Sequence, residues 1–450
     1  MTRRTLIVLA ICVSARAETT PVYFDYLEDG KLTGGRIMVD LSDPGQRAAF
    51  GFDSYGVAVV WPVTTLVDNG EPGNRIDLVM LGDGYTASEI GQYADHVDAV
   101  LSLFLVEHPL AAYVSYFNVH RVDVVSNESG VDEPDNGIYR DTALDMTYYC
   151  AGIPRLLCIN QGKAVAAAAN APDTDQILAL ANSTRYGGGG FVDLCTLAGN
   201  SSAAVELALH EFGHSFVGLA DEYDYGDGAT YTGPEPSEPN VGIYDEPAQT
   251  ALQTKWYLWM DLPNVSTFEG AMYNQYGLFR PTTNSKMRSL SRPFEEINVE
   301  QFILTIYQTV SPIDSVTPDS ADPLPGCSVF QVVPMQPVSH ALDVQWTVDG
   351  AAIPGATGTT FSADTASLTP GVHEVGVTVT DNTSEVRDEV ARGLWMTDER
   401  VWQIVVPSSP DECAAAVPAV SGYMIGAMLA LLTVAGVLVL QHRQHCARAR

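Results

Sequence analysis

Apolar and polar positions alternate differently in three parts of the chain, and the pattern predicts a fold class for each part. Residues 18–67 alternate with period two around turns, which predicts a small β-rich module, either prodomain-like or a packing element. Residues 68–310 combine apolar strands with an amphipathic helix that opens at the capping box Thr86-Ala-Ser-Glu89. The strands predicted in this middle part are 76–81, 117–125 and 176–182. The middle part is therefore expected to be α/β.

The third part follows a linker at 311–326 that is rich in Pro, Ser and Asp. Residues 327–407 return to period two, with Trp346 at the centre of one run. Short strands at this spacing predict an immunoglobulin-like β-sandwich. Because it carries no catalytic constellation, we interpret it as a spacer or adhesion module.

The two ends of the chain predict export and anchoring. Residues 1–17 have a basic start, an apolar run and a small-residue cleavage site, as in a signal peptide. After a second linker at 408–419, residues 420–440 carry no charge and are long enough to span a membrane, and the tail 441–450 is basic. We therefore expect a cell-surface protein with a C-terminal transmembrane helix. The alternative is a sorting signal that is removed, which would release the protein.

The net charge of −32 restricts the partners of the chain. Nucleic-acid binding requires positive patches, so a nucleic-acid partner is excluded. Acidic loops at 132–136 and 221–227 have the oxygen ligands that Ca²⁺ prefers, but neither has EF-hand spacing. Calcium stays an open alternative with no site assigned, and the sequence makes no prediction of oligomeric state.

The cysteines predict one disulfide in the middle part. Cys150 and Cys158 close a short loop and are the expected pair. Cys327 and Cys413 flank the predicted sandwich and are a second candidate pair. Cys195 is interpreted as a buried thiol, because no partner for nucleophilic catalysis accompanies it.

The segment His210-Glu-Phe-Gly-His214 carries the strongest chemical signal in the chain. Two histidines at positions i and i+4 share one helix face, so both imidazoles can reach one Zn²⁺. Glu211 then lies beside the metal, where it can act as general base toward a water molecule that zinc acidifies. Gly218 is expected to end the helix with a positive φ.

A third protein ligand is expected after Gly218, because catalytic zinc usually takes three and leaves the fourth position to water. In metzincins the third ligand follows the glycine by three residues, and Asp221 has this interval. The glycine comes one residue later than usual, however, and the ligand would be a carboxylate. Asp221 is predicted as the third ligand, and Glu222 is the alternative.

Several segments in one order resemble a known family, the IgA metallopeptidases, which are bacterial zinc peptidases. The segments are Ile76–Thr86, Tyr116–His120, Ser129–Asp132, Tyr186–Gly188, the zinc helix through Tyr223, and Asn284–Arg288. The resemblance implies a metzincin-like fold with zinc on His210, His214 and an acidic third ligand. It also implies that Glu211 is the base and that Met287 lies in the Met-turn beneath the metal. In metzincin-like folds a peptide pairs with the edge strand before the zinc helix, here near the glycines at 187–190, for which a surface loop is the alternative.

The sequence therefore predicts an α/β (α+β) metzincin-like zinc peptidase domain between a β-rich module and a β-sandwich. Its function would be hydrolysis of peptide bonds in extracellular proteins, with a protein or peptide substrate as partner. Tyr273 and Tyr276 are candidate donors to a transition-state oxyanion, but both are treated as ordinary packed or surface aromatics. The alternative function is a surface adhesion or binding protein that keeps its zinc but has little turnover. Whether an N-terminal segment must be removed for activity is left open.

Overall fold

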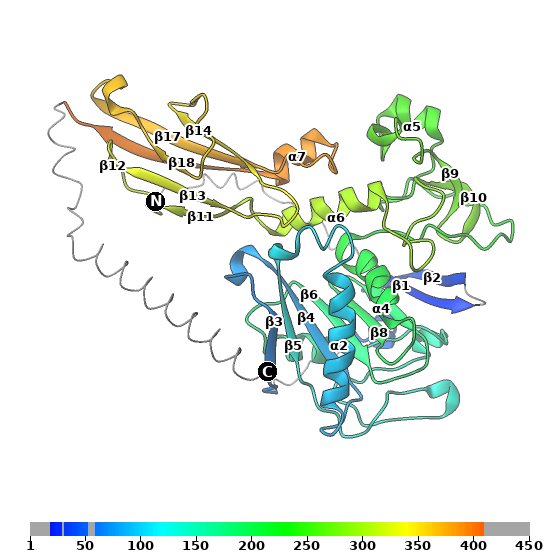
Figure 1. Cartoon of the computed structure of the whole chain (residues 1–450). Helices are drawn as coiled ribbons and strands as arrows, with labels where there is room; N and C mark the ends of the chain where they lie inside the picture. The colour runs from blue at the N-terminus through cyan, green and yellow to red at the C-terminus, as the bar shows by residue number, and fades with distance from the viewer. Residues whose placement is uncertain (1–18, 29–30, 53–58, 409–450) are drawn as a thin grey trace, which may run out of the picture.

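The protein has a mixed α/β architecture built on one large sheet, as seen in a computed structural model that describes residues 19–28, 31–52 and 59–408 (Figure 1). The strand order of this sheet is β2-β1-β7-β8-β6-β4-β5-β3. Its strands are β1 (Thr19–Glu28), β2 (Lys31–Asp40), β3 (Val63–Val67), β4 (Ile76–Asp83), β5 (Phe117–Val122), β6 (Gln176–Ala181), β7 (Gly188–Phe191) and β8 (Leu194–Ala198). The central strands β5, β4, β6 and β8 run parallel, and the outer strands are antiparallel to their neighbours.

The central strands are apolar because both faces of the sheet are covered. All residues of β4 and β6 are buried, which is typical of parallel strands between two layers. Leu78 and Met80 face the core formed with α2 (Ile90–Phe104) and α4 (Ala204–Phe212). Val79 and Leu81 face the opposite core, which includes α3 (Gln161–Ala168) and the loops before it. These apolar strands therefore provide the surface against which α4, the helix that carries His210, packs.

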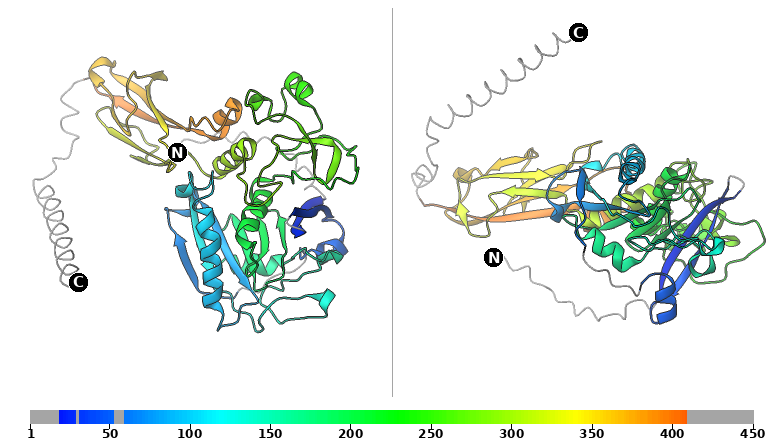
Figure 2. Two further views of the ribbon diagram at one scale, coloured as in Figure 1. Left: turned by 45° about the vertical axis from the view of Figure 1, so that its right-hand side comes forward. Right: turned by 90° about the horizontal axis from the view of Figure 1, so that it is seen from below.

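The strands of the predicted N-terminal module join both edges of this large sheet. The hairpin β1–β2 extends one edge, where β1 pairs with β7, and β3 lies at the other edge beside β5. A short helix, α1 (Pro44–Ala49), follows the hairpin and begins at the N-cap Asp43. Figure 2 shows the hairpin in dark blue at the end of the molecule far from the C-terminal sheets. The period-two pattern correctly indicated strands, but it could not indicate which strands would be their partners.

Two further sheets form the C-terminal part of the described chain. One has the order β11-β13-β16 and the other β12-β18-β17-β14-β15. They share a core around Phe330, Trp346 and Trp402, which explains the period-two pattern of their strands. The strands are β11 (Ile313–Thr317), β12 (Leu324–Pro325), β13 (Val329–Pro334), β14 (Asp343–Val348), β15 (Ala351–Ala352), β16 (Thr360–Ser362), β17 (Gly371–Thr380) and β18 (Thr397–Val406).

The remaining elements connect these layers. They are η1 (Pro72–Asn74), η2 (Val114–Tyr116), η3 (Pro134–Asn136), η4 (Cys150–Gly152), η5 (Gly213–Val217), α5 (Glu246–Leu252), η6 (Tyr257–Trp259), β9 (Phe268–Ala271), β10 (Asn274–Arg280), α6 (Glu296–Thr309), η7 (Thr365–Ser367) and α7 (Glu389–Trp395). The buried carboxylate of Asp381 connects the C-terminal sheets to the rest of the protein by hydrogen bonds. Asp381 accepts hydrogen bonds of 2.8 Å from the hydroxyls of Tyr113 and Tyr307, and one from His340.

The predicted localisation needs correction. Among the residues that the structure describes, no helix is long and apolar enough to cross a membrane. The predicted anchor at 420–440, the basic tail after it and the predicted signal peptide at 1–17 lie outside the described residues. The structure thus gives no support to a surface protein held by a transmembrane helix. Cys413 also lies outside the described residues, so its predicted pairing with Cys327 stays a prediction.

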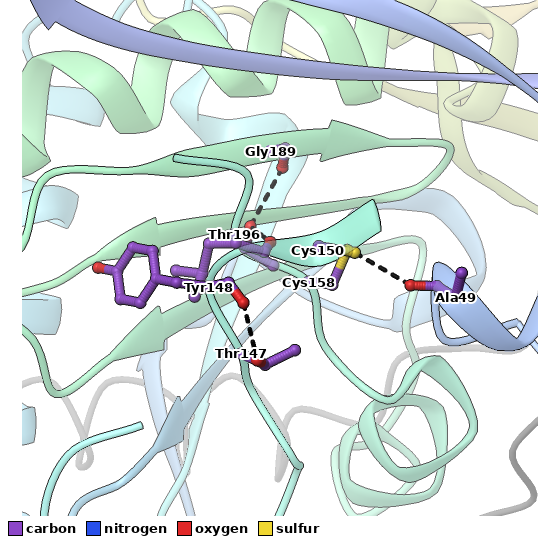
Figure 3. The surroundings of a disulfide bond; sticks show 8 residues. Ala49, Thr147, Tyr148, Cys150, Cys158, Gly189 and Thr196 are labelled. Carbon is purple, nitrogen blue, oxygen red and sulfur yellow. Dashed lines mark hydrogen bonds between the residues drawn. A yellow bond between two sulfur atoms is a disulfide. The ribbon is translucent and has the colours of Figure 1, made fainter. Parts of the chain in front are cut away.

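The disulfide between Cys150 and Cys158 is present, as the sequence predicts (Figure 3). The loop that it closes packs on the glycine strand β7. The amide of Leu157 donates to the carbonyl of Gly188, and the Thr196 hydroxyl of β8 donates to the carbonyl of Leu157 at 2.6 Å. The disulfide loop therefore supports β7 from one face of the sheet.

We expect the double variant Cys150→Ser, Cys158→Ser to be less stable than the wild type by about 2–3 kcal/mol. The two cysteines are eight positions apart, and closing a loop of this length removes about that much conformational freedom from the unfolded chain. Urea denaturation measures the difference. Reducing agent should lower the unfolding midpoint of the wild type but leave that of the variant unchanged. Equal midpoints for the two proteins under oxidising conditions would contradict this expectation.

Candidate metal centre

Both histidines of the motif lie on one continuous helical segment. The α-helix α4 carries His210, and the π-helical turn η5 that continues it carries His214. Leu207, Ala208 and Phe212 are buried, so the segment is fixed against the core. The chain leaves the helix at Gly218, whose φ of 73° is left-handed, as expected of a glycine at this position.

The two imidazoles point toward each other with their Nε2 atoms 3.1 Å apart. The Nδ1 atom of His210 lies 3.0 Å from the carbonyl oxygen of Lys286, and that of His214 lies 2.7 Å from the carbonyl oxygen of Leu219. A carbonyl oxygen only accepts hydrogen bonds, so each Nδ1 carries the proton. Each Nε2 of a neutral ring therefore presents a lone pair to the other. Two lone pairs at this separation suit a shared cation.

Two buried carboxylates complete the cluster. The Oδ1 atom of Asp221 lies 3.2 Å from Nε2 of His210 and 3.4 Å from Nε2 of His214. The Oδ2 atom of Asp25, on β1, lies 3.4 Å and 3.5 Å from the same two nitrogens. Neither carboxylate oxygen has a hydrogen-bond partner. Asp25, His210, His214 and Asp221 thus form a buried group with metal-ligand geometry, and buried charges of this kind require a compensating cation.

The charge balance of the cluster agrees with a bound cation. Burial lowers the pKa of His214, but the carboxylates of Asp221 and Asp25 together outweigh burial and raise this pKa to about 10. Burial raises the pKa of Glu211 well above its usual value, and the negative charge of Asp25 raises it further. Once a divalent metal displaces the protons from the histidines, the four residues offer it two neutral nitrogen donors and two anionic oxygen donors.

Two tyrosines orient the carboxylates. The Tyr273 hydroxyl donates to Oδ2 of Asp221, and the Tyr223 hydroxyl donates to Oδ1 of Asp25, each at 2.6 Å. Each carboxylate therefore has one oxygen held by a phenol and the other directed into the cluster. Met272 and Tyr273 have positive φ angles of 44° and 71°, a costly conformation that places the Tyr273 ring beside Asp221. Tyr276, the other tyrosine considered from the sequence, is 45% exposed.

The other two acidic residues of the motif occupy different environments. Glu211 is completely buried, and neither of its carboxylate oxygens has a hydrogen-bond partner. Glu222 is also buried, but it accepts hydrogen bonds from Asn240, Asn298 and Ser285. The Glu222 carboxylate thus fixes the loop, whereas the Glu211 carboxylate makes no such contact.

Met287 lies directly beneath the helical segment. It is fully buried, and a Cβ atom added to Gly213 would lie 2.9 Å from its sulfur. The residue before it, Lys286, supplies the carbonyl that orients His210. The turn that contains Met287 therefore supports the cluster from below without contributing a ligand.

The glycine run at 187–190 enters a buried strand, β7, and is not a surface loop. A Cβ atom at Gly190 would lie 2.9 Å from Cβ of His214 and 3.2 Å from a carboxylate oxygen of Glu211. A Cβ atom at Gly188 would lie 3.1 Å from the other oxygen of Glu211. Glycine is therefore needed here because the strand and the zinc-motif helix pack with no room for a side chain.

We expect Gly190→Ala to destabilise the protein by about 1–3 kcal/mol, because overpacking forces the strand or the helix to move. Displacement of His214 should also weaken metal binding. Gly91→Ala in α2 is the matched control, since nothing lies within 4 Å of its added Cβ. Urea midpoints and the zinc content after dialysis measure both effects. If Gly190→Ala had the same stability and zinc content as the Gly91→Ala control, close packing of β7 on the helix would not require glycine at position 190.

Asp25 is the member of the cluster that the sequence did not reveal. It lies on a strand in the predicted N-terminal module, far in sequence from the histidines, and no short spacing links it to them. A signal is visible in retrospect, since an acidic residue interrupts the aromatic run Tyr23-Phe-Asp25-Tyr26. By contrast, two carboxylates of the acidic run at 132–136, those of Glu133 and Asp135, form ion pairs with Arg185.

A match to a known protein family covers three of the four residues of this cluster. Residues 64–264 match the family model described as IgA Peptidase M64. The match confirms the resemblance found in the sequence and supports a peptidase activity for this segment. The IgA Peptidase M64 segment contains His210, Glu211, His214 and Asp221, but Asp25 and Met287 lie outside it. No match was found among curated proteins.

Proposed function

We propose that the protein is a zinc-dependent endopeptidase that hydrolyses peptide bonds of proteins, with Glu211 as general base. The observation that carries the proposal is the convergence of two histidine Nε2 atoms and a carboxylate oxygen of Asp221 in a buried cluster. The family match supports hydrolysis of peptide bonds. Two imidazoles and one carboxylate are a ligand set that catalytic zinc sites use.

His210, His214 and Asp221 are the proposed ligands. Zinc held there would supply Lewis acidity toward the scissile carbonyl group and the attacking water. The hydrogen bonds from Nδ1 to backbone carbonyls fix both imidazoles in the correct tautomer, and Tyr273 fixes Asp221. The ligands are therefore oriented before the metal binds, which favours affinity.

Glu211 is proposed to move the proton. Its carboxylate is buried beside the two histidines and has no hydrogen-bond partner. It can take a proton from the attacking water and deliver it to the leaving nitrogen, and such transfers contribute typically about 10²–10⁴-fold to a rate. Burial raises the pKa of Glu211, and a cation on the neighbouring ligands would counteract this rise and keep the carboxylate able to accept the proton.

Cleavage of a mixed peptide library by the zinc-loaded full chain tests the proposal. Because Asp25 lies among the ligand atoms, the assay also includes the Asp25→Ala variant. We expect new amino termini that appear with zinc, disappear with a chelator and return when zinc is restored. Stoichiometric zinc without any cleavage, in either protein, would favour the alternative of a binding protein that only retains its metal.

A further inference from the structure

We propose that the β1–β2 hairpin holds this peptidase in a latent form, with Asp25 as a fourth metal ligand in the position that catalysis requires to be open. The inference rests on the proposed function and concerns residues outside the matched family segment. A catalytic zinc site takes three protein ligands and keeps the fourth position for water or substrate, whereas a site with four protein ligands is closed. In this structure the donor atoms of four residues that could bind a metal converge.

The contacts of Asp25 are those of a ligand. Its Oδ2 atom is buried, has no hydrogen-bond partner and lies within 3.5 Å of both histidine Nε2 atoms. Its other oxygen is held by the Tyr223 hydroxyl. Asp221 is held by Tyr273 in the same manner. The two carboxylates are thus presented to the cluster in equivalent ways, although only Asp221 belongs to the zinc motif.

The same hairpin covers the strand that a peptide substrate would use. β1 pairs antiparallel with β7 at Tyr23 and Gly190, and addition of a strand to a sheet edge is a general way to bind an extended peptide. The Tyr23 ring also stacks on His214, with centroids 4.1 Å apart and planes 5° from parallel. A segment of the chain itself therefore lies where the substrate backbone would pair, beside the metal ligands.

The hairpin is more extensively paired within itself than with the rest of the sheet. β1 and β2 pair with each other at ten successive positions, whereas the pairing of β1 with β7 among the described residues is that of Tyr23 with Gly190. Val22 and Val39 attach the hairpin to the core of the sheet. Tyr23 and Arg36 both contact the buried carboxylate of Glu238. Displacement of the hairpin would expose β7 and open one metal position together, so a single movement would activate the enzyme.

Asp25→Ala and Asp25→Asn in the full chain test this proposal. Asparagine keeps the shape of aspartate but is a weaker ligand, and Asp40→Ala removes another carboxylate of the same hairpin as a control. If the open form makes up about 0.1–10% of the wild type, both Asp25 variants should hydrolyse peptides about 10- to 1000-fold faster. Asp40→Ala should behave as the wild type.

The visible absorption of the cobalt-substituted proteins provides a readout that is independent of activity. We expect both Asp25 variants to change the spectrum, because one protein ligand is lost, and a chelator should extract their metal faster. An unchanged spectrum and extraction rate would overturn the assignment of Asp25 as a ligand. Rates equal to that of an active wild type would overturn latency and leave the proposed function intact. A changed spectrum with no hydrolysis by any variant would refute the peptidase function and latency together.

Discussion

Glu211→Gln is expected to lower the rate of peptide hydrolysis by about 10²–10⁴-fold without loss of zinc, because general base catalysis contributes that much. The glutamine side chain has nearly the same shape but cannot take a proton from water. None of the proposed ligand atoms belongs to Glu211, so one zinc per chain should remain. The rates are best compared in the Asp25→Ala background, where no carboxylate at position 25 can occupy a metal position.

Glu399→Gln on β18 is the control for this substitution, since it changes an exposed glutamate in the C-terminal sheets. It should leave both rate and zinc content unchanged. A Glu211→Gln variant that keeps full activity would show that another group moves the proton. Loss of zinc from this variant would instead assign Glu211 to the ligand set.

Asp221→Ala is expected to reduce zinc affinity more than about 100-fold in the Asp25→Ala background, a larger loss than removal of a residue outside the ligand set usually causes. The Asp25→Ala background is needed because Asp221→Ala alone would leave Asp25, His210 and His214 as three possible ligands. With both carboxylates removed, only the two imidazoles remain of the cluster. Competition with a zinc indicator measures the affinity.

Glu222→Gln in the same background is the matched comparison, because Glu222 was the alternative ligand. Its oxygens accept hydrogen bonds from Asn240, Asn298 and Ser285, and glutamine can keep most of them. We expect zinc affinity close to that of the parent and a modest loss of stability, about 1 kcal/mol for one altered hydrogen bond. Normal affinity in Asp221→Ala with a large loss in Glu222→Gln would reverse the proposed assignment.

The site could be predicted from sequence where its parts are close together along the chain. His210, Glu211 and His214 lie within two helical turns, so helix geometry alone places them on one side. The unusual position of Gly218 has a local explanation that periodicity did not reveal. The π-helical turn Gly213–Val217 accommodates an additional residue, so Gly218 and Asp221 still reach the cluster despite the longer interval.

The pairing of β1 with β7 and the position of Asp25 could not be predicted from the sequence. Alternation correctly indicated that residues 19–40 form strands, but pairing partners are set by tertiary contacts that a period-two pattern does not encode. For this reason the hairpin was expected in a module of its own, although β1 pairs with β7 and brings Asp25 to the histidines. The family match confirmed the peptidase segment but does not extend to this strand.

The most direct test of the central claim is the initial rate of peptide hydrolysis as a function of zinc bound per chain, measured with metal-free Asp25→Ala protein. We expect no hydrolysis without metal and a rate that rises in proportion to bound zinc. The rate should not increase further beyond one equivalent of zinc. Hydrolysis by the metal-free protein, or none at one equivalent of bound zinc, would contradict the central claim.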